Sequence, residues 1–180
     1  MRSMAARADV AVFDATPLIF LARIGLLEES LKLFLTCLIA ETVKEEVVDS
    51  GRTVGAPETA ELESLIAKGR LVIERVPRTP LGVRLEANPH LSKGDRDSLV
   101  LASERTARLM ADDAAMRSVA SQLGLRLGGT LYILHGLTDR RMLTPAEAVD
   151  ALDQLVDAGW YCSARLYRVA RAAFEKRESR

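Results

Sequence analysis

The chain has 180 residues, about the length of one ordinary domain, and 48% of them are hydrophobic while 28% are charged. This composition is typical of a globular protein and excludes a disordered chain. The chain has 25 Lys and Arg residues and 25 Asp and Glu residues, so its formal net charge is zero. This argues against a strongly basic surface that binds nucleic acid non-specifically. Aromatic residues make up only 4%, which argues against a base-stacking platform.

The cysteines and the apolar stretches indicate the cellular compartment of the protein. Cys37 and Cys162 lie far apart and form no metal or disulfide pattern, which favours a reducing setting. The N-terminus lacks the apolar core of a signal peptide, and the most apolar stretch, residues 17–27, is interrupted by Arg23 and too short for a bilayer. We expect a soluble, cytoplasmic protein without membrane contact.

Short apolar runs alternate with helical patterns, which predicts an α/β fold with a parallel sheet. The apolar runs predict strands at residues 10–13, 35–39, 71–73, 108–111 and 125–127. We expect a single domain over residues 1–180, with a core at about 8–138 and a helical extension at about 139–180.

The helical patterns have start and stop signals. Capping residues and prolines predict one helix that begins at the Thr16 cap, and a second over 41–49 that stops at Gly51. Two further helices are predicted over 57–68 and about 92–106, and another ends at Gly124. Near the C-terminus, one helix is predicted from the 144–147 capping box to a stop at Gly159, and a last one over 163–176. Residues 76–94 are rich in proline and glycine and predict a long loop, a candidate lid over a substrate.

Acidic residues follow the predicted strands and begin the predicted helices. Asp14 ends the first strand, Asp112 and Asp113 end a later one, Asp95 opens a helix, and Glu46 lies within another. The carboxyl ends of parallel strands and the helix starts that follow them share one edge of the sheet, where ligands bind. Carboxylates that converge there would raise one another's pKa, and a divalent cation such as Mg²⁺ removes that conflict.

Each acidic residue also has an ordinary structural interpretation. Asp14 fits a turn residue, Asp95 completes a capping box with Ser92, and either Asp112 or Asp113 fits a helix cap. Glu46 alone is typical of a solvated helix residue. None of these signals is specific by itself.

Four short motifs in order make a specific pattern. They are Val12-Phe13-Asp14-Ala15-Thr16-Pro17-Leu18, Val43-Lys44-Glu45-Glu46, Gly94-Asp95-Arg96-Asp97-Ser98-Leu99-Val100-Leu101-Ala102, and Asp112-Asp113 with Arg117 and Ala120. This pattern, with the later Gly128-Gly129-Thr130-Leu131, resembles PIN-domain nucleases over residues 8 to 170, and within them a prokaryotic subgroup that includes VapC-like toxins. Two positions depart from the subgroup: Asp95 replaces a glutamate, and Ala40 stands where proline is common. Neither departure removes a carboxylate.

The resemblance implies an α/β/α sandwich with a central, mainly parallel sheet of four to five strands and extra C-terminal helices. It also implies a metal-dependent ribonuclease that uses Mg²⁺ or Mn²⁺ to hydrolyse phosphodiester bonds in RNA. Asp14, Asp95 and Asp112 or Asp113 would bind the metal, and Glu46 would orient or deprotonate a water. Thr16 would position Asp14.

Further implications concern partners. Many small prokaryotic members are toxins held inactive by an antitoxin, so the resemblance implies a cognate antitoxin, and we expect a homodimer. Basic residues near the motifs are candidate RNA contacts, although each is also typical of a solvated surface: Lys44, Arg52, Lys93, Arg96 and Arg117. His90 and His135 are interpreted as structural or solvated.

Three other classes of protein share part of this acidic pattern. A haloacid-dehalogenase-like phosphatase needs a second aspartate two residues after the first, where this chain has Thr16. A phosphoreceiver domain needs an early acidic pair and a late lysine, yet the pair here comes late and no lysine lies between Lys93 and Lys176. A PIN-like module that binds nucleic acid or protein without catalysis stays open.

Overall fold

The structure is a computed structural model that describes residues 10–178, with side chains as far as Lys176. Residues 1–9 and 179–180 of the expected domain lie outside the described residues. Five strands form one sheet in the order β3-β2-β1-β4-β5, and every neighbouring pair is parallel. The strands are β1 (Val10–Phe13), β2 (Thr36–Ala40), β3 (Val72–Glu74), β4 (Arg108–Met110) and β5 (Arg126–Gly128).

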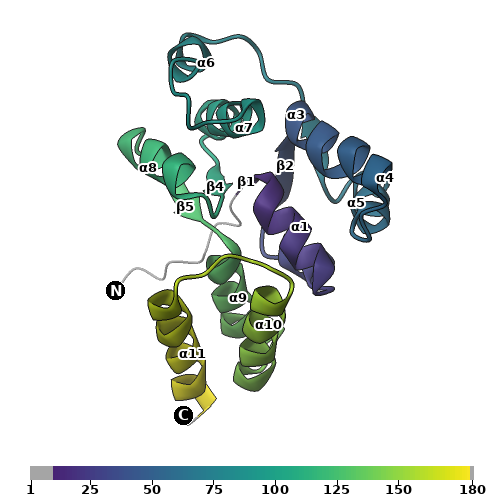
Figure 1. The fold of residues 1–180 in the computed structure, drawn as a ribbon, viewed down its shortest axis with the longest axis vertical. Coiled ribbons are helices and arrows are strands. Elements are labelled where there is room, and N and C mark those ends of the chain that lie inside the picture. The colour runs from purple at the N-terminus through teal and green to yellow at the C-terminus, as the bar shows by residue number, and fades with distance from the viewer. Residues whose placement is uncertain (1–9, 179–180) are drawn as a thin grey trace.

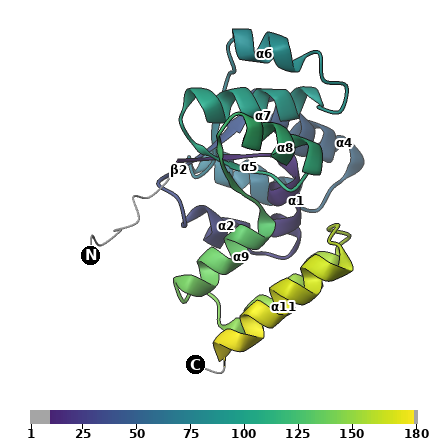
Figure 2. The ribbon, with the colours of Figure 1, turned by 90° about the vertical axis from the view of Figure 1, so that its left-hand side faces the viewer.

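Helices cover both faces of this sheet. They are α1 (Ala15–Arg23), α2 (Leu27–Leu31), α3 (Glu41–Lys44), the π-helical η1 (Glu45–Ser50), α4 (Gly51–Val54), α5 (Thr59–Ala67), α6 (Pro80–Leu85), α7 (Lys93–Glu104), α8 (Ala114–Gln122), α9 (Thr130–Asp139), α10 (Pro145–Asp157) and α11 (Ala164–Glu178). Figure 2 shows α6 and α7 on one side of the sheet and α1 and α2 on the other. The predicted α/β/α fold with four to five strands is confirmed.

The centre of the sheet carries the core. Val12 and Phe13 of β1 are fully buried, and the Phe13 ring meets Phe34 edge to face at 5.6 Å between centroids. A parallel sheet covered on both faces needs apolar side chains on both faces of each strand, which explains the unbroken apolar run.

The chain moves from β1 to β2 and β3, then returns to β4 on the other side of β1. Ligands of open α/β sheets bind at the carboxyl edge beside such a reversal.

The C-terminal helices form a second cluster. Helices α9, α10 and α11 lie together below the sheet in Figure 1, and α10 packs against α11. Leu134, Leu152 and Phe174 are fully buried in their core. The predicted capping box is present, because Thr144 Oγ1 accepts from Glu147 N and Glu147 Oε2 accepts from Thr144 N. None of the described helices is both long and apolar enough to cross a membrane.

The first helix begins earlier than its sequence predicts. The expected cap at Thr16 is wrong, because Asp14 occupies the N-cap position and α1 starts at Ala15. Pro17 is therefore the third residue of the helix. The first N–H groups of a helix have no partner within the helix, so a proline fits anywhere in its first turn and does not identify the first position.

The predicted helix stop at Gly51 is also wrong. The helical path runs from α3 through η1 and α4, and it ends at Gly55 in the left-handed conformation, with φ of 69°. A Cβ atom at Gly51 would lie 2.6 Å from Oγ1 of Thr59, so this glycine serves close packing against α5. The signal that suggested a helix end is therefore a packing requirement.

The predicted loop over 76–94 contains a helix. Residues Pro80–Leu85 form α6, and Oγ1 of Thr79 caps it by accepting from the N–H of Gly82 at 3.0 Å. Thr79 at the N-cap followed by Pro80 at the first helical position is a start signal that the nearby prolines and glycines obscured. Only the segments on either side of α6 are irregular.

Candidate active site

Asp14 lies at the carboxyl end of the central strand. Its backbone N–H donates to the carbonyl of Met110 at 3.0 Å, which holds it beside the end of β4, and the residue is only 5% exposed. Burial, together with the negative charges of Asp95 and Glu46, raises the pKa of Asp14 to about 7, although the N–H groups of Ala15 and Thr16 oppose the shift. The carboxylate is therefore poorly stabilised as an anion.

Glu46 reaches the same place from the π-helical segment. A Cβ atom at Gly94 would lie 3.3 Å from Oε2 of Glu46, so the carboxylate packs closely against the start of α7. Burial raises the pKa of Glu46, and the charge of Asp95 adds to the shift. Single π-turns occur often at functional sites, and here one carries an acidic residue of the cluster.

Asp95 has both of the roles that its sequence allows. Its backbone N–H donates to Oγ of Ser92 at 3.0 Å, and its Oδ2 accepts from the N–H of Ser92 at 2.6 Å, so the predicted capping box is present. The same carboxylate raises the pKa of both Asp14 and Glu46. The structural role therefore places the charge at the edge of the sheet and does not replace a chemical role.

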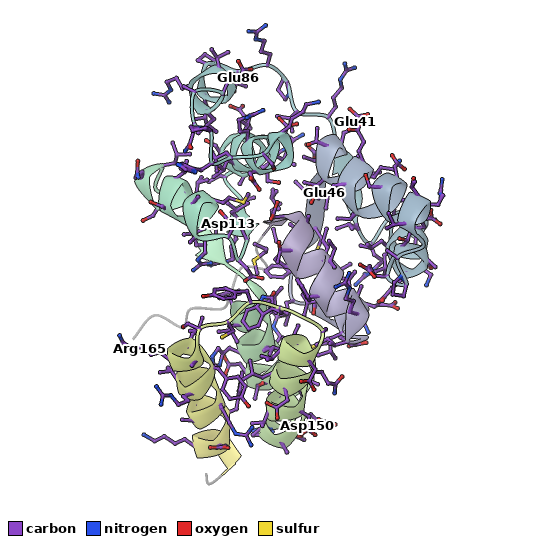
Figure 3. The ribbon with its side chains drawn as sticks, viewed as in Figure 1. Glu41, Glu46, Glu86, Asp113, Asp150 and Arg165 are labelled. Carbon is purple, nitrogen blue, oxygen red and sulfur yellow. The ribbon has the colours of Figure 1, made fainter. Side chains whose placement is uncertain are left out.

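The structure distinguishes the two aspartates that follow β4. Both oxygens of Asp112 are occupied: Oδ1 accepts from Thr130 N at 2.9 Å, and Oδ2 accepts from Thr130 Oγ1 at 2.6 Å and from Trp160 Nε1 at 3.1 Å. Asp113 caps α8 through Oδ1, which accepts from Met116 N at 2.8 Å, and its Oδ2 has no hydrogen bond within the described part of the chain. In Figure 3, Glu46 and Asp113 lie to either side of the beginning of α1.

Three of the candidate RNA contacts have partners within the protein. Nζ of Lys44 lies 2.7 Å from Oδ1 of Asp49, and the guanidinium of Arg52 pairs with Glu63. Nη1 of Arg117 donates to the carbonyls of Ala111 and Gly128 at 2.9 and 2.7 Å, which joins the ends of β4 and β5. Arg117 therefore has a clear structural task at the edge of the sheet.

The remaining two candidates line a cavity with cations that sequence reasoning missed. This cavity of about 380 Å³ lies between α3, α6, α7 and residues 75–79, and Arg75, Arg78, Lys93 and Arg96 line it together with Glu41, Glu86 and Asp97. Arg96 donates to the carbonyl of Leu91. Lys93, Arg75 and Arg78 make no hydrogen bond or ion pair with any described residue. The sequence signal that could have identified this group of cations is the pair Arg75 and Arg78, within four residues of the end of β3.

The donor set suits a hard divalent cation by its chemistry. Asp14, Glu46 and Asp95 repel one another at one edge of the sheet, and carboxylate oxygens are what Mg²⁺ and Mn²⁺ prefer. Within the described part of the chain, however, no three carboxylate, imidazole or thiol groups are close enough to form a metal site as they stand. The three carboxylates are thus in electrostatic contact without being gathered at ligand distance. Thr16, the second residue of α1, is half-buried beside Asp14.

Comparison with known proteins identifies the fold family. A family model described as a PIN domain matches residues 10–176 and so includes every acidic residue discussed above. No curated protein is significantly similar to the chain. PIN domains are generally nucleases that act on nucleic acid, and they usually use divalent metal ions. Because the match extends over nearly all of the described residues, the chain belongs to the PIN-domain family.

Proposed function

We propose that this protein is a metal-dependent ribonuclease that hydrolyses phosphodiester bonds. One observation carries the proposal: Asp14 is buried at the carboxyl end of the central strand, within electrostatic reach of Asp95 and Glu46. Charged groups that oppose one another in a buried place cost stability, and such an arrangement is typical of functional sites. Both the resemblance of the motifs and membership of the PIN family support a nuclease.

Asp14, Asp95 and Asp113 are the residues that would hold Mg²⁺ or Mn²⁺. Asp113 is favoured over Asp112 because Asp112 already accepts three hydrogen bonds, whereas one oxygen of Asp113 is uncommitted among the described residues. The ion, when bound, lowers the pKa of a water ligand and neutralises charge on the phosphate. Each aspartate keeps its place through the backbone contacts of its own helix start.

Glu46 is assigned to the attacking water. A raised pKa makes a carboxylate a better proton acceptor near neutral pH, and burial together with Asp95 gives Glu46 this property. The backbone N–H of Thr16 is one of the two groups that oppose the raised pKa of Asp14, so the Thr16 side chain is assigned to hold that carboxylate in place. Lys93 and Arg96 are assigned to phosphates of the RNA beside the cluster.

The biological setting is part of the same proposal. The resemblance to VapC-like toxins supports a toxin of a toxin–antitoxin pair in the cytoplasm, with a cognate antitoxin and a homodimer as further partners. RNA as the substrate rests on the same resemblance. The same carboxylates would also suit a nuclease that cuts DNA, so cleavage must be measured on both RNA and DNA.

The test compares the wild type with Asp14→Asn, which keeps the shape of the side chain and removes its charge. Mn²⁺ binding is followed by calorimetry, and cleavage of single-stranded RNA is scored in parallel. Asp150→Asn is the matched control, because Asp150 is exposed on α10, far from Glu46 and Asp113 in Figure 3. We expect both binding and cleavage to be lost in Asp14→Asn alone. A wild type that neither binds Mn²⁺ nor cuts RNA or DNA would support the non-catalytic module.

A further inference from the structure

A second cavity, of about 280 Å³, opens at the carboxyl ends of β4 and β5. Three of its lining residues are aromatic: Tyr132 of α9, and Trp160 and Tyr161 from the segment between α10 and α11. The whole chain has one Trp, three Tyr and four Phe residues. The chain is poor in aromatic residues, yet three of its eight aromatic rings line this one cavity.

This aromatic cavity adjoins the acidic cluster, the group formed by Asp14, Glu46 and Asp95. The N–H of Asp14 donates to Met110 of β4 at 3.0 Å, and the N–H of Ala111 donates to Gly128 of β5 at 3.3 Å. Asp112 lines the cavity, and the next residue in the chain is Asp113. The cavity therefore lies on the same sheet edge as Asp14, toward β5.

Short-range contacts hold two of the rings in place. The indole Nε1 of Trp160 donates to Asp112, and the guanidinium carbon of Arg108 lies 4.7 Å from the centroid of the Tyr132 ring. A Cβ atom at Gly128 would lie 3.1 Å from Cδ1 of Tyr132, so this glycine leaves the room that the ring needs. The cavity is thus formed before anything binds to it.

The two tyrosine rings of this cavity are exposed to solvent. Tyr161 is 89% exposed and Tyr132 is 41% exposed, whereas Trp160 is only 5% exposed. Neither tyrosine hydroxyl makes a hydrogen bond with the residues that the structure describes. Apolar rings exposed around a cavity mark binding sites, and unpaired bases are held by stacking on aromatic side chains.

We propose that this cavity binds an unpaired nucleobase of a single-stranded nucleic acid whose neighbouring phosphate lies at the acidic cluster. The inference rests on the proposed function for that phosphate, and it adds a substrate class: strands with an accessible base. A duplex keeps its bases stacked and paired, so it cannot present one to Tyr132 and Tyr161 without first opening.

The test measures binding without cleavage. The full chain is titrated with a single-stranded RNA ten nucleotides long in EDTA, and the emission of Trp160, the sole tryptophan, reports occupancy. The comparison ligands are an abasic strand of equal length and charge and a blunt duplex. The variants are Tyr161→Ala, Tyr161→Phe and the control Leu35→Ala, because Leu35 is 72% exposed before β2, at the opposite edge of the sheet.

We expect single-stranded RNA to change the Trp160 emission in a saturable way. Tyr161→Ala should weaken binding about tenfold, the loss of roughly one stacked base, whereas Tyr161→Phe and Leu35→Ala should stay within about twofold of the wild type. The abasic strand and the duplex should bind more weakly than the intact strand.

Two results would overturn the proposal. One is an equal affinity of wild type and Tyr161→Ala for the RNA, which includes the absence of any binding. The other is a wild-type dimer that Tyr161→Ala dissociates without changing RNA affinity, because the cavity would then be an interface between two copies. If binding follows the expectation but no strand is cut with Mn²⁺ present, the base pocket stands and the nuclease proposal fails.

Discussion

The indole of Trp160 donates a hydrogen bond of 3.1 Å to Oδ2 of Asp112, although 48 residues separate the two in the chain. This bond links the segment before α11 to the end of β4. Thr130 of α9 donates two more hydrogen bonds to the same carboxylate. Asp112 therefore connects the C-terminal helices to the sheet edge that carries the acidic cluster.

Replacing Asp112 should destabilise the whole protein more than replacing its neighbour. Asp112→Ala removes the acceptor of three hydrogen bonds and should lower the free energy of unfolding by about 3 kcal/mol, since bonds to a charged group are the stronger ones. Asp113→Ala removes one helix cap and should cost about 1 kcal/mol. Urea unfolding followed by Trp160 emission measures both. Equal losses would mean that Asp112 does not join the two clusters.

Gly129 should not tolerate a side chain. A Cβ atom there would lie 2.5 Å from Oδ1 of Asp112 and 3.0 Å from the carbonyl oxygen of Ala111, and the backbone carbonyl cannot turn away. We expect Gly129→Ala to cost about 2 kcal/mol of stability, as overpacking usually does. Gly82→Ala is the control, because a Cβ atom within α6 would meet its neighbours at 3.5 Å or more. It should raise stability by about 0.5 kcal/mol, and a thermal melt of each variant distinguishes the two effects.

The capping box of α10 should make stability depend on pH. Hydrogen bonds from the backbone and the hydroxyl of Thr144 lower the pKa of Glu147 from 4.5. A carboxyl group whose pKa is lower in the folded state stabilises the fold above its unfolded pKa and loses that contribution as the pH falls through the folded pKa. Wild type should therefore be more stable than Glu147→Gln at pH 7, and the gap should shrink below about pH 4.5.

Urea midpoints of the two proteins at pH 7, 5 and 3.5 measure this gap. Glutamine preserves the capping geometry at this position, so the comparison isolates the charge. A gap that stays constant down to pH 3.5 would show that the stabilisation does not come from ionisation of Glu147.

The sequence predicts the fold well because its strongest signals are periodic. The apolar run at Val10–Phe13 and its counterparts in the other strands predicted all five strands within one or two residues. The errors came from residues with two uses. Gly51 suggested a helix end but serves packing, and Asp14 occupies the N-cap position that Thr16 was expected to hold.

The candidate site could be predicted only in part. Fold logic led to the expectation that the acids converge, and the structure places Asp14, Glu46 and Asp95 in electrostatic contact. The different surroundings of Asp112 and Asp113 depend on Thr130 and Trp160, which no local pattern connects to them. Aromatic composition likewise counts rings without showing which ones meet in space.

Lys93 should contribute to RNA binding through charge alone. It is exposed at the start of α7, two residues before Asp95, and has no ion-pair partner among the described residues. It also lines the basic cavity, the cavity of about 380 Å³ that Arg75, Arg78 and Arg96 line as well. A lysine that contacts one phosphate of a single strand releases counterions, so Lys93→Ala should reduce the slope of log affinity against log salt by about 0.7. Filter binding in EDTA between 50 and 200 mM salt, roughly the range where this term is large, measures the slope. Lys68→Ala, at the exposed end of α5, is the matched control and should leave it unchanged. If the two variants have the same slope, Lys93 does not contact the RNA backbone, and the basic cavity lies outside the path of the strand.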